Sequence, residues 1–199
     1  MNKKINISII GTRGYPYVYS GYETFVKQLS ERLVLKNCNV TIYCHKGLFE
    51  IRPKEIKGIK LVYVPTIETK ILSQPIHSFL SIIHACFSNT DVLLVVNSAN
   101  GPFGLLTKLF KVPTAINVDG LEWLRPKWKG LGSIYFKWAS KMATLFYDQI
   151  INDSDEMRKV YLDLFKRDSK VIAYGANIRK SKNPELINKW NLKQKIGRA

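Results

Sequence analysis

The residues best suited to chemistry lie in two loops, and one of these loops carries paired carboxylates. Residues 117–129 read NVDGLEWLRPKWK, so that Asp119 and Glu122 flank Gly120. In such a pair, one carboxylate can act as a general base while the other accepts hydrogen bonds from hydroxyl groups. Asp119 and Glu122 are therefore the candidate catalytic residues. The alternative is that Asp119 only caps a turn.

The same segment carries flat aromatic rings and cations. Trp123 and Trp128 offer apolar faces of the kind on which carbohydrate rings stack, and Arg125 and Lys127 can donate hydrogen bonds to phosphate oxygens. These four residues form a candidate binding surface for a phosphorylated sugar. In the alternative interpretation, both tryptophans pack in the hydrophobic core.

A glycine-rich loop follows the apolar run Ile5–Ile10. Residues 11–21 read GTRGYPYVYSG and lead into a helical pattern. Backbone N–H groups at such a strand-to-helix junction attract anions. The candidate residues of a diphosphate cleft are Gly11, Thr12, Arg13, Gly14, Gly21 and Glu23. The alternative is that the first two glycines only form a tight turn and that the charged pair lies on a solvated surface.

Familiar cofactor and metal patterns do not occur in this sequence. The glycine spacing departs from G-x-G-x-x-G, and Cys44, His45 and Lys46 stand where a ribose-binding acid would be expected, which argues against NAD. No GK[ST] sequence indicates a P-loop, the three cysteines form no CxxC pair, and the histidines lack ligand spacing. We expect neither a metal nor a bound cofactor.

The hydrophobic pattern predicts the elements that position these loops. Strands are expected at Ile5–Ile10, Asn39–Cys44, Ile59–Val64, Asp91–Val96, Thr114–Val118, Gln149–Asn152 and Val171–Tyr174. Helices are expected at Tyr22–Lys36, Pro75–Phe87, Pro102–Phe110, Leu131–Tyr147 and from the cap Ser154 to Phe165. This alternation predicts an α/β fold with a doubly wound parallel sheet, in which ligands bind beyond the carboxyl ends of the strands.

Length and charge limit the class of protein. The chain has 199 residues and a net charge of +16, and roughly 100–200 residues form one domain. We assign residues 1–176 to that domain and interpret 177–199 as a basic linker or the start of a further domain. No apolar run approaches the roughly 20 residues of a membrane span, so we expect a cytoplasmic protein or one peripheral on the inner face of the cell membrane.

The positive charge admits two classes of partner. A sequence pI of about 9.8 is compatible with nucleic acid, but no nucleic-acid-binding motif supports that class. Residues 123–147 instead combine five cations with many aromatic rings and no acid, a composition suited to an anionic membrane surface. The alternative is a solvated helix face followed by a basic tail.

Two long motifs together resemble those of a known family. Residues 11–33 read GTRGYPYVYSGYETFVKQLSERL, and residues 116–128 read INVDGLEWLRPKW. In order and separation they are similar to the N-terminal, rhamnosyltransferase-type domain called DUF1972 of bacterial, GT4-like glycosyltransferases with GT-B architecture. The resemblance covers roughly Ile5 to Gly175. Ser20 replaces a glycine of the family pattern, and Tyr22 replaces a phenylalanine.

The resemblance implies a Rossmann-like N-terminal half of a GT-B fold, a half that mainly holds the acceptor. Asp119 would then be the catalytic base or polar catalytic group, with Glu122 supporting it. The glycine loop, with Gly21 and Glu23, would face the cleft between the two domains. Trp123 matches the second motif.

The resemblance also implies a function. It suggests transfer of rhamnose or a related hexose from a nucleotide-sugar, such as dTDP-rhamnose, to a lipid-linked saccharide in cell-surface polysaccharide synthesis. Most of the donor site would belong to a second domain, in cis or in trans, so the 199-residue chain is expected to be inactive by itself. The alternative is a non-enzymatic membrane-docking or partner subunit that lacks its own donor site.

Overall fold

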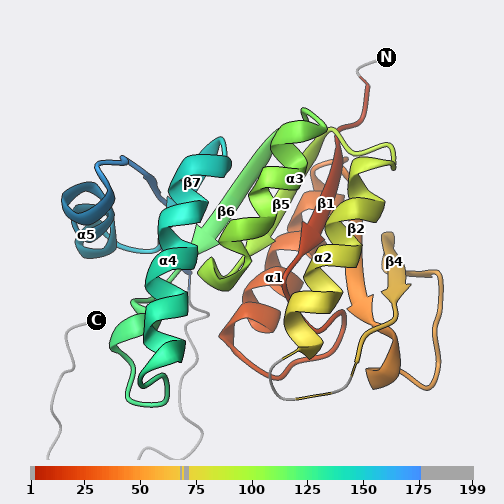
Figure 1. Ribbon diagram of the computed structural model, residues 1–199. Coiled ribbons are helices and arrows are strands. Elements are labelled where there is room, and N and C mark those ends of the chain that lie inside the picture. The colour runs from red at the N-terminus through yellow and green to blue at the C-terminus, as the bar shows by residue number, and fades with distance from the viewer. Residues whose placement is uncertain (1–2, 68, 70–71, 176–199) are drawn as a thin grey trace, which may run out of the picture.

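The computed structural model describes residues 3–67, 69 and 72–175, with a mostly parallel sheet at the centre (Figure 1). The strands are β1 (Asn6–Ile10), β2 (Asn39–His45), β3 (Glu55–Ile56), β4 (Ile59–Val64), β5 (Val92–Val96), β6 (Thr114–Val118), β7 (Gln149–Asn152) and β8 (Lys170–Val171). The α-helices are α1 (Gly21–Leu35), α2 (Ser73–Cys86), α3 (Gly104–Leu109), α4 (Leu131–Phe146) and α5 (Asp155–Phe165). Three short 3₁₀ helices are η1 (Lys46–Leu48), η2 (Ser98–Phe103) and η3 (Glu122–Leu124). The predicted basic tail, residues 177–199, lies outside the described residues.

The strands are ordered β3-β4-β2-β1-β5-β6-β7-β8, and every neighbouring pair is parallel except β3–β4. The chain starts in the middle of the sheet at β1, builds outward through β2 and β4, and returns to β5 on the other side of β1. Ile9 consequently pairs with Ile42 on one side and with Leu94 on the other. The predicted doubly wound sheet is confirmed. Its winding reverses between β1 and β5, where such sheets bind ligands.

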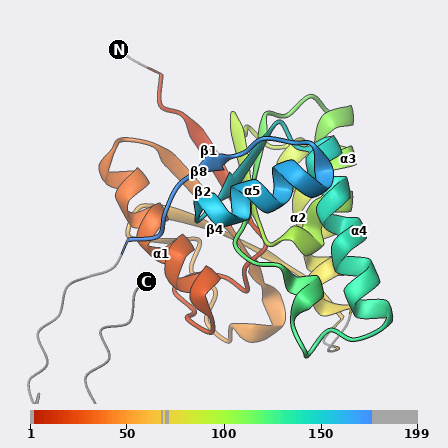
Figure 2. The same ribbon diagram turned by 90° about the vertical axis from the view of Figure 1, so that its left-hand side faces the viewer.

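Helices cover both faces of the sheet. Helices α2, α3 and α4 lie together on one face, and α1 lies on the other (Figures 1 and 2). One core joins Ile82 of α2, Phe136 of α4 and Tyr161 of α5, while a second core joins Val26 of α1 to the opposite face of the central strands. The central strand β5 is apolar along its whole length because both faces of the sheet are buried there.

The structure differs from the predicted elements in three places. The predicted helix at Pro102 begins as η2, which then continues into α3. Strand β3, which forms a short hairpin with the predicted strand β4, lies where no strand or helix is predicted. The last strand has only two residues instead of the predicted Val171–Tyr174, because β7 ends at Asn152 and offers no further pairing partner.

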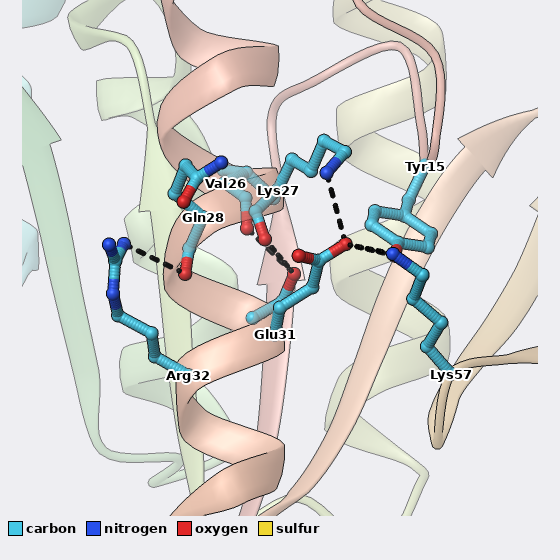
Figure 3. A network of polar contacts seen from close by, with 8 residues as sticks. Tyr15, Val26, Lys27, Gln28, Glu31, Arg32 and Lys57 are labelled. Carbon is cyan, nitrogen blue, oxygen red and sulfur yellow. Dashed lines mark hydrogen bonds and ion pairs between the residues drawn. The ribbon is translucent and has the colours of Figure 1, made fainter. Parts of the chain in front are cut away.

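Helix α1 is fixed to the loop before it by a carboxylate that accepts three donors (Figure 3). Glu31 accepts a hydrogen bond from the hydroxyl of Tyr15 at 2.7 Å and forms ion pairs with Lys27 and Lys57 at 3.1 Å each. The tyrosine hydroxyl, followed by the two ammonium groups, lowers the pKa of Glu31 from 4.5 to about 2. This network ties the loop after β1 to α1 and to the β3–β4 turn.

We expect Glu31→Gln to lower the free energy of unfolding by about 1–2 kcal/mol at neutral pH, because hydrogen bonds to a charged acceptor are lost. The pKa of Glu31 is depressed in the folded state, so its contribution is complete above pH 4.5 and disappears as the pH falls toward 2. Urea unfolding at a series of pH values measures this. The exposed Glu50→Gln is the control and should stay within about 0.5 kcal/mol. A difference between wild type and Glu31→Gln that does not shrink toward low pH would contradict the assignment.

Candidate functional site

The loop between β1 and α1 (residues 11–20, the first loop) is built around two glycines with no room for a side chain. Gly11 has a φ of +108°, and a Cβ there would lie 2.3 Å from the carbonyl oxygen of Val96 at the end of β5. Gly14 has a φ of +133°, and its Cβ would contact Cys44 and Phe49 at 2.8–2.9 Å. Both positions require glycine because L-residues are strained at positive φ. Both glycines therefore form a tight turn, and a role of their backbone in a diphosphate cleft stays a prediction.

Glu23 closes the first loop onto the start of α1. Its carboxylate accepts hydrogen bonds from the backbone N–H of Arg13 at 3.1 Å and of Ser20 at 2.9 Å, and also from the Ser20 hydroxyl. This is a capping box, in which the third helical residue reaches back to the cap. Glu23 is buried, so the interpretation of a solvated surface residue is wrong for this side chain. Its geometry is that of a residue that shapes the loop.

Arg13 and Thr12 have different environments in the first loop. The guanidinium of Arg13 lies 4.2 Å from the ring centroid of Tyr19, and no ion pair to it occurs within the described residues. Thr12 is buried, and its hydroxyl has no hydrogen-bond partner among the described residues. The first loop thus places one cation without an ion pair and one buried hydroxyl without a hydrogen bond beside the point where the order of the strands reverses.

The loop between β6 and α4 (residues 119–130, the second loop) folds around the buried carboxylate of Glu122. One oxygen pairs with Nε of Arg125 at 3.0 Å. The other accepts a hydrogen bond from Nε1 of Trp128 at 2.9 Å and lies 3.6 Å from Nζ of Lys127. The candidate residues Arg125, Lys127 and Trp128 thus all contact Glu122. Both oxygens of Glu122 are engaged, so this carboxylate holds the side chains around it in place. Its supporting role in catalysis stays a prediction.

The two tryptophans of the second loop have different environments. Trp123 is 8% exposed and packs against Tyr161 and Phe165 of α5, with ring centroids 6.5 and 6.1 Å away. Its ring faces are covered by protein, as in the alternative interpretation of a core residue. Trp128 is only partly buried and packs against Phe136 at 4.7 Å. Of the two, Trp128 is the ring that a ligand can approach.

Asp119 stands where four segments of the chain meet. It follows β6 directly, and its Oδ2 lies 3.2 Å from the hydroxyl of Tyr174, a residue beyond β8. The hydroxyl of Tyr22, in the first turn of α1, is close enough to Asp119 to lower its pKa. Asp153, directly after β7, adds a second carboxylate nearby. The cap of a local turn would not gather partners from so many distant segments.

The environment of Asp119 changes its acidity. Partial burial raises the pKa of this carboxyl above its ordinary value, and the negative charge of Asp153 adds to that rise. The hydroxyls of Tyr22 and Tyr174, and the charge of Arg125, act in the opposite direction. Burial is the larger influence. A raised pKa makes a carboxylate a stronger base at neutral pH, which is what proton abstraction from a hydroxyl requires.

Some residues of this site were not identified from sequence. Tyr174 donates a hydrogen bond to Asn117 at 2.7 Å and packs on Phe25 of α1 at 4.9 Å, so it links the end of the sheet to α1. Asp153 could have been found, since it follows a predicted strand as Asp119 does. Nothing in the local sequence marks Tyr174, because its partners lie far away in the chain. Tyr22 belongs to the first motif, but its position beside Asp119 could not be read from the sequence.

The described residues offer no cluster of three or more histidine, cysteine or acidic side chains with the geometry to hold a metal ion. Within the same part of the chain, no helix is both long and apolar enough to cross a bilayer. The candidate site is thus a set of carboxylate, hydroxyl, amide and basic groups at the carboxyl edge of the sheet. Such groups can bind hydroxyls and phosphates and can move a proton.

Comparison with known proteins gives one family match. Residues 4–177 match the family described as "Domain of unknown function (DUF1972)". No curated protein matches the sequence.

Solved structures share the fold at low sequence identity. Sucrose-phosphate synthase from Thermosynechococcus elongatus is 15% identical with a TM-score of 0.57, and the match covers 86% of this chain and 90% of that one. UGT2 of Phytolacca americana, complexed with UDP-2fluoro-glucose and pterostilbene, is 10% identical with a TM-score of 0.55, covering 96% and 58%. UGT89C1 of Arabidopsis thaliana, complexed with UDP-L-rhamnose, is 13% identical with a TM-score of 0.52, covering 96% and 55%. The chain therefore spans just over half the length of both UGT chains.

Proposed function

Because this chain belongs to the DUF1972 family and has the Rossmann-like fold of GT-B glycosyltransferases, we propose that it is the acceptor-binding part of a glycosyltransferase. In the proposed reaction a hydroxyl oxygen of the acceptor bonds to the anomeric carbon of a nucleotide-sugar. The bond from that carbon to the diphosphate breaks, and the nucleoside diphosphate leaves with the electron pair. The acceptor hydroxyl loses its proton.

The observation that carries this proposal is the position of Asp119. This half-buried carboxylate has a raised pKa, lies at the carboxyl edge of the sheet, receives a hydrogen bond from Tyr174 and lies near the hydroxyl of Tyr22. It accepts the hydrogen bond of the acceptor hydroxyl and takes its proton. The two tyrosines hold the carboxylate in one orientation. Glu122 acts through the second loop, which it shapes.

The remaining residues divide between the two substrates. The backbone of Gly11–Gly14 and the side chain of Arg13 face the diphosphate of the donor, while Gly21 and Glu23 set the start of α1. Arg125, Lys127 and Trp128 contact the acceptor, because they surround Glu122 at the outer side of the second loop. The core position of Trp123 favours a supporting role under this surface.

The finer identity of the substrates follows from the family resemblance. We propose rhamnose or a related hexose as the transferred sugar, with dTDP-rhamnose as one candidate donor, and a lipid-linked saccharide as the acceptor in cell-surface polysaccharide synthesis. A donor-binding domain supplies most of the nucleotide site, in cis or in trans. The protein works on the cytoplasmic side of the membrane, and no nucleic acid takes part. The alternative function is a docking subunit without catalysis.

Transfer of labelled sugar tests the proposal. The protein expressed from its full reading frame is incubated with dTDP-rhamnose or UDP-sugars and with lipid extracts that contain saccharide acceptors. We expect label in the lipid fraction with at least one donor. We also expect none when residues 1–199 are used by themselves. If no donor gives labelled lipid while the protein is folded, the transfer function is wrong and the docking alternative is favoured.

A further inference from the structure

We propose that the layer formed by α2, η2, α3 and α4, here called the helical face, docks on the surface of an anionic lipid bilayer. The proposal rests on the proposed function only for the lipid-linked nature of the acceptor. Helices α2, α3 and α4 lie side by side in front of the sheet in Figure 1 and form one side of the molecule in Figure 2. One surface of this layer packs on the sheet, and its outer surface is not covered by another element of the described residues.

The helical face contains no acidic residue. The sequences of α2, η2, α3 and α4 include neither aspartate nor glutamate, although the chain has 15 acids. The other helices differ, because α1 carries two acids and α5 carries three. Exposed cations of the helical face and of the turn after α3 are Lys108, Lys111, Lys137 and Lys141. None of them forms an ion pair within the described residues.

Helix α4 exposes an apolar stripe beside these cations. Its inner side buries Phe136 and Ala143, whereas Leu131, Ile134 and Trp138 on its outer side are 84%, 66% and 48% exposed. The outer residues follow each other at intervals of three and four, so they lie along one side of the helix. Most soluble helices turn one apolar side to the core and a polar side outward. The second apolar side of α4 needs another partner.

The neighbouring helices α2 and α3 also expose large apolar side chains. Phe79 of α2 and Leu105 of α3 are both exposed by more than two fifths, and Phe87 and Phe110 form an exposed ring pair at 4.8 Å. The helices are joined at their surface as well, because the hydroxyl of Tyr135 donates a hydrogen bond to the carbonyl of η2 residue Ala99 at 2.9 Å. Exposed apolar side chains that gather on one face can mark an interaction site.

Charge complementarity selects a lipid surface as the partner. Scattered lysines around large apolar side chains and a tryptophan resemble the composition of interfacial helices, in which apolar groups enter the headgroup region and cations face anionic lipid. A groove of about 500 Å³ lies between α4 and α5, at the edge of the helical face. Its lining also combines lysines with large apolar side chains, among them Ile134, Lys137, Trp138, Lys141 and Leu164.

The position of the helical face suits an enzyme that acts on lipid-linked substrates. Helix α4 begins directly after the second loop, so the exposed Leu131 and Ile134 follow Arg125 and Lys127 closely in the chain. Docking through this face would bring the proposed acceptor surface to the level of the lipid headgroups. The helical face itself lies beside the sheet, so it leaves the carboxyl edge open.

Vesicle sedimentation with the full chain tests the proposal. The probes are vesicles of phosphatidylcholine alone and of phosphatidylcholine with phosphatidylglycerol in equal proportions. We expect binding to the anionic vesicles that weakens with salt. Lys137→Gln combined with Lys141→Gln should weaken this binding about 25-fold, since each cation near the surface contributes about a factor of five. Trp138→Ala should weaken it by about tenfold or more.

The matched control removes the same charge elsewhere. Lys36 and Lys54 are exposed and lie outside the helical face, so Lys36→Gln combined with Lys54→Gln should change binding by less than about fivefold. Equal losses in both double variants would show that only the net charge matters and would overturn the proposal. Circular dichroism confirms that each variant is folded.

Two further measurements identify what occupies the helical face. Tryptophan emission should shift to shorter wavelength on anionic vesicles, and Trp138→Phe should remove most of this shift. Self-association in ultracentrifugation that is abolished by Trp138→Ala would identify a second copy as the occupant and overturn the lipid assignment. The binding assay needs no donor sugar. Vesicle binding without transfer would contradict only the proposed function, and transfer without vesicle binding would contradict only this inference.

Discussion

Asp119→Asn is expected to lower the rate of sugar transfer by about 10²–10⁴-fold, the usual contribution of a general base. The amide has nearly the same shape as the carboxylate and still accepts a hydrogen bond from the Tyr174 hydroxyl, but it cannot take a proton. The loss should therefore appear in kcat, with little change in the thermal midpoint. Steady-state kinetics of the full-length protein measure it. Asp163→Asn, an isosteric change at an exposed position of α5, serves as the control.

The pH profile adds an independent readout of the same assignment. Asp119 must be ionised to act, so activity should fall as the pH drops through its raised pKa. The Tyr174 hydroxyl stabilises the charged form and lowers that pKa, so Tyr174→Phe should move the acidic limb of the profile to higher pH. Full activity of Asp119→Asn, or an acidic limb that does not move in Tyr174→Phe, would remove Asp119 from the catalytic role.

Gly11→Ala should lower the free energy of unfolding by about 2–5 kcal/mol. A positive φ costs an L-residue roughly 1–2 kcal/mol, and overpacking adds about 1–3 kcal/mol. The new Cβ would lie 2.3 Å from the carbonyl oxygen of Val96, a backbone atom of a buried strand that can shift only at a cost. Denaturant unfolding measures the change. If the variant folds, β1 and β5 must separate at the point where the sheet reverses, so donor binding should weaken as well.

Gly21→Ala is the matched control for this prediction. Gly21 belongs to the same glycine-rich motif, but nothing lies within 4 Å of a Cβ added there, and the residue is the first of α1. Alanine should be neutral or stabilise the fold by up to about 1 kcal/mol, because it restricts the unfolded chain. Equal destabilisation by both substitutions would mean that the clash at Gly11 is not the cause.

The sequence determined most of the elements because their signals are local. Alternating apolar runs and helical stripes identified the strands and long helices, and their alternation indicated the doubly wound sheet. Elements with weak local signals were missed or misjudged. Strand β3 has two residues, and the extent of β8 is set by the length of β7, to which it pairs.

The loops that carry chemistry were also visible in the sequence, since a carboxylate or glycine directly after a buried strand must lie at the carboxyl edge. The roles within these loops depended on distant segments. Glu122 and Glu23 are acids in long motifs, yet the oxygens of both already have partners nearby. Those of Glu122 contact side chains of the second loop, and those of Glu23 accept backbone N–H groups of the first loop. Asp119 differs because its partners come from α1 and from the segment beyond β8.

By itself, then, the sequence determined the fold class, the order of the elements and the two loops in which to look for chemistry. Only the tertiary structure decided that Trp123 is a core residue while Trp138 is exposed, and that Tyr174 reaches Asp119. The physical reason is that strand and helix formation follow from patterns within a few residues. The burial of a side chain and the acidity of a carboxyl depend on which remote segments the sheet brings alongside them.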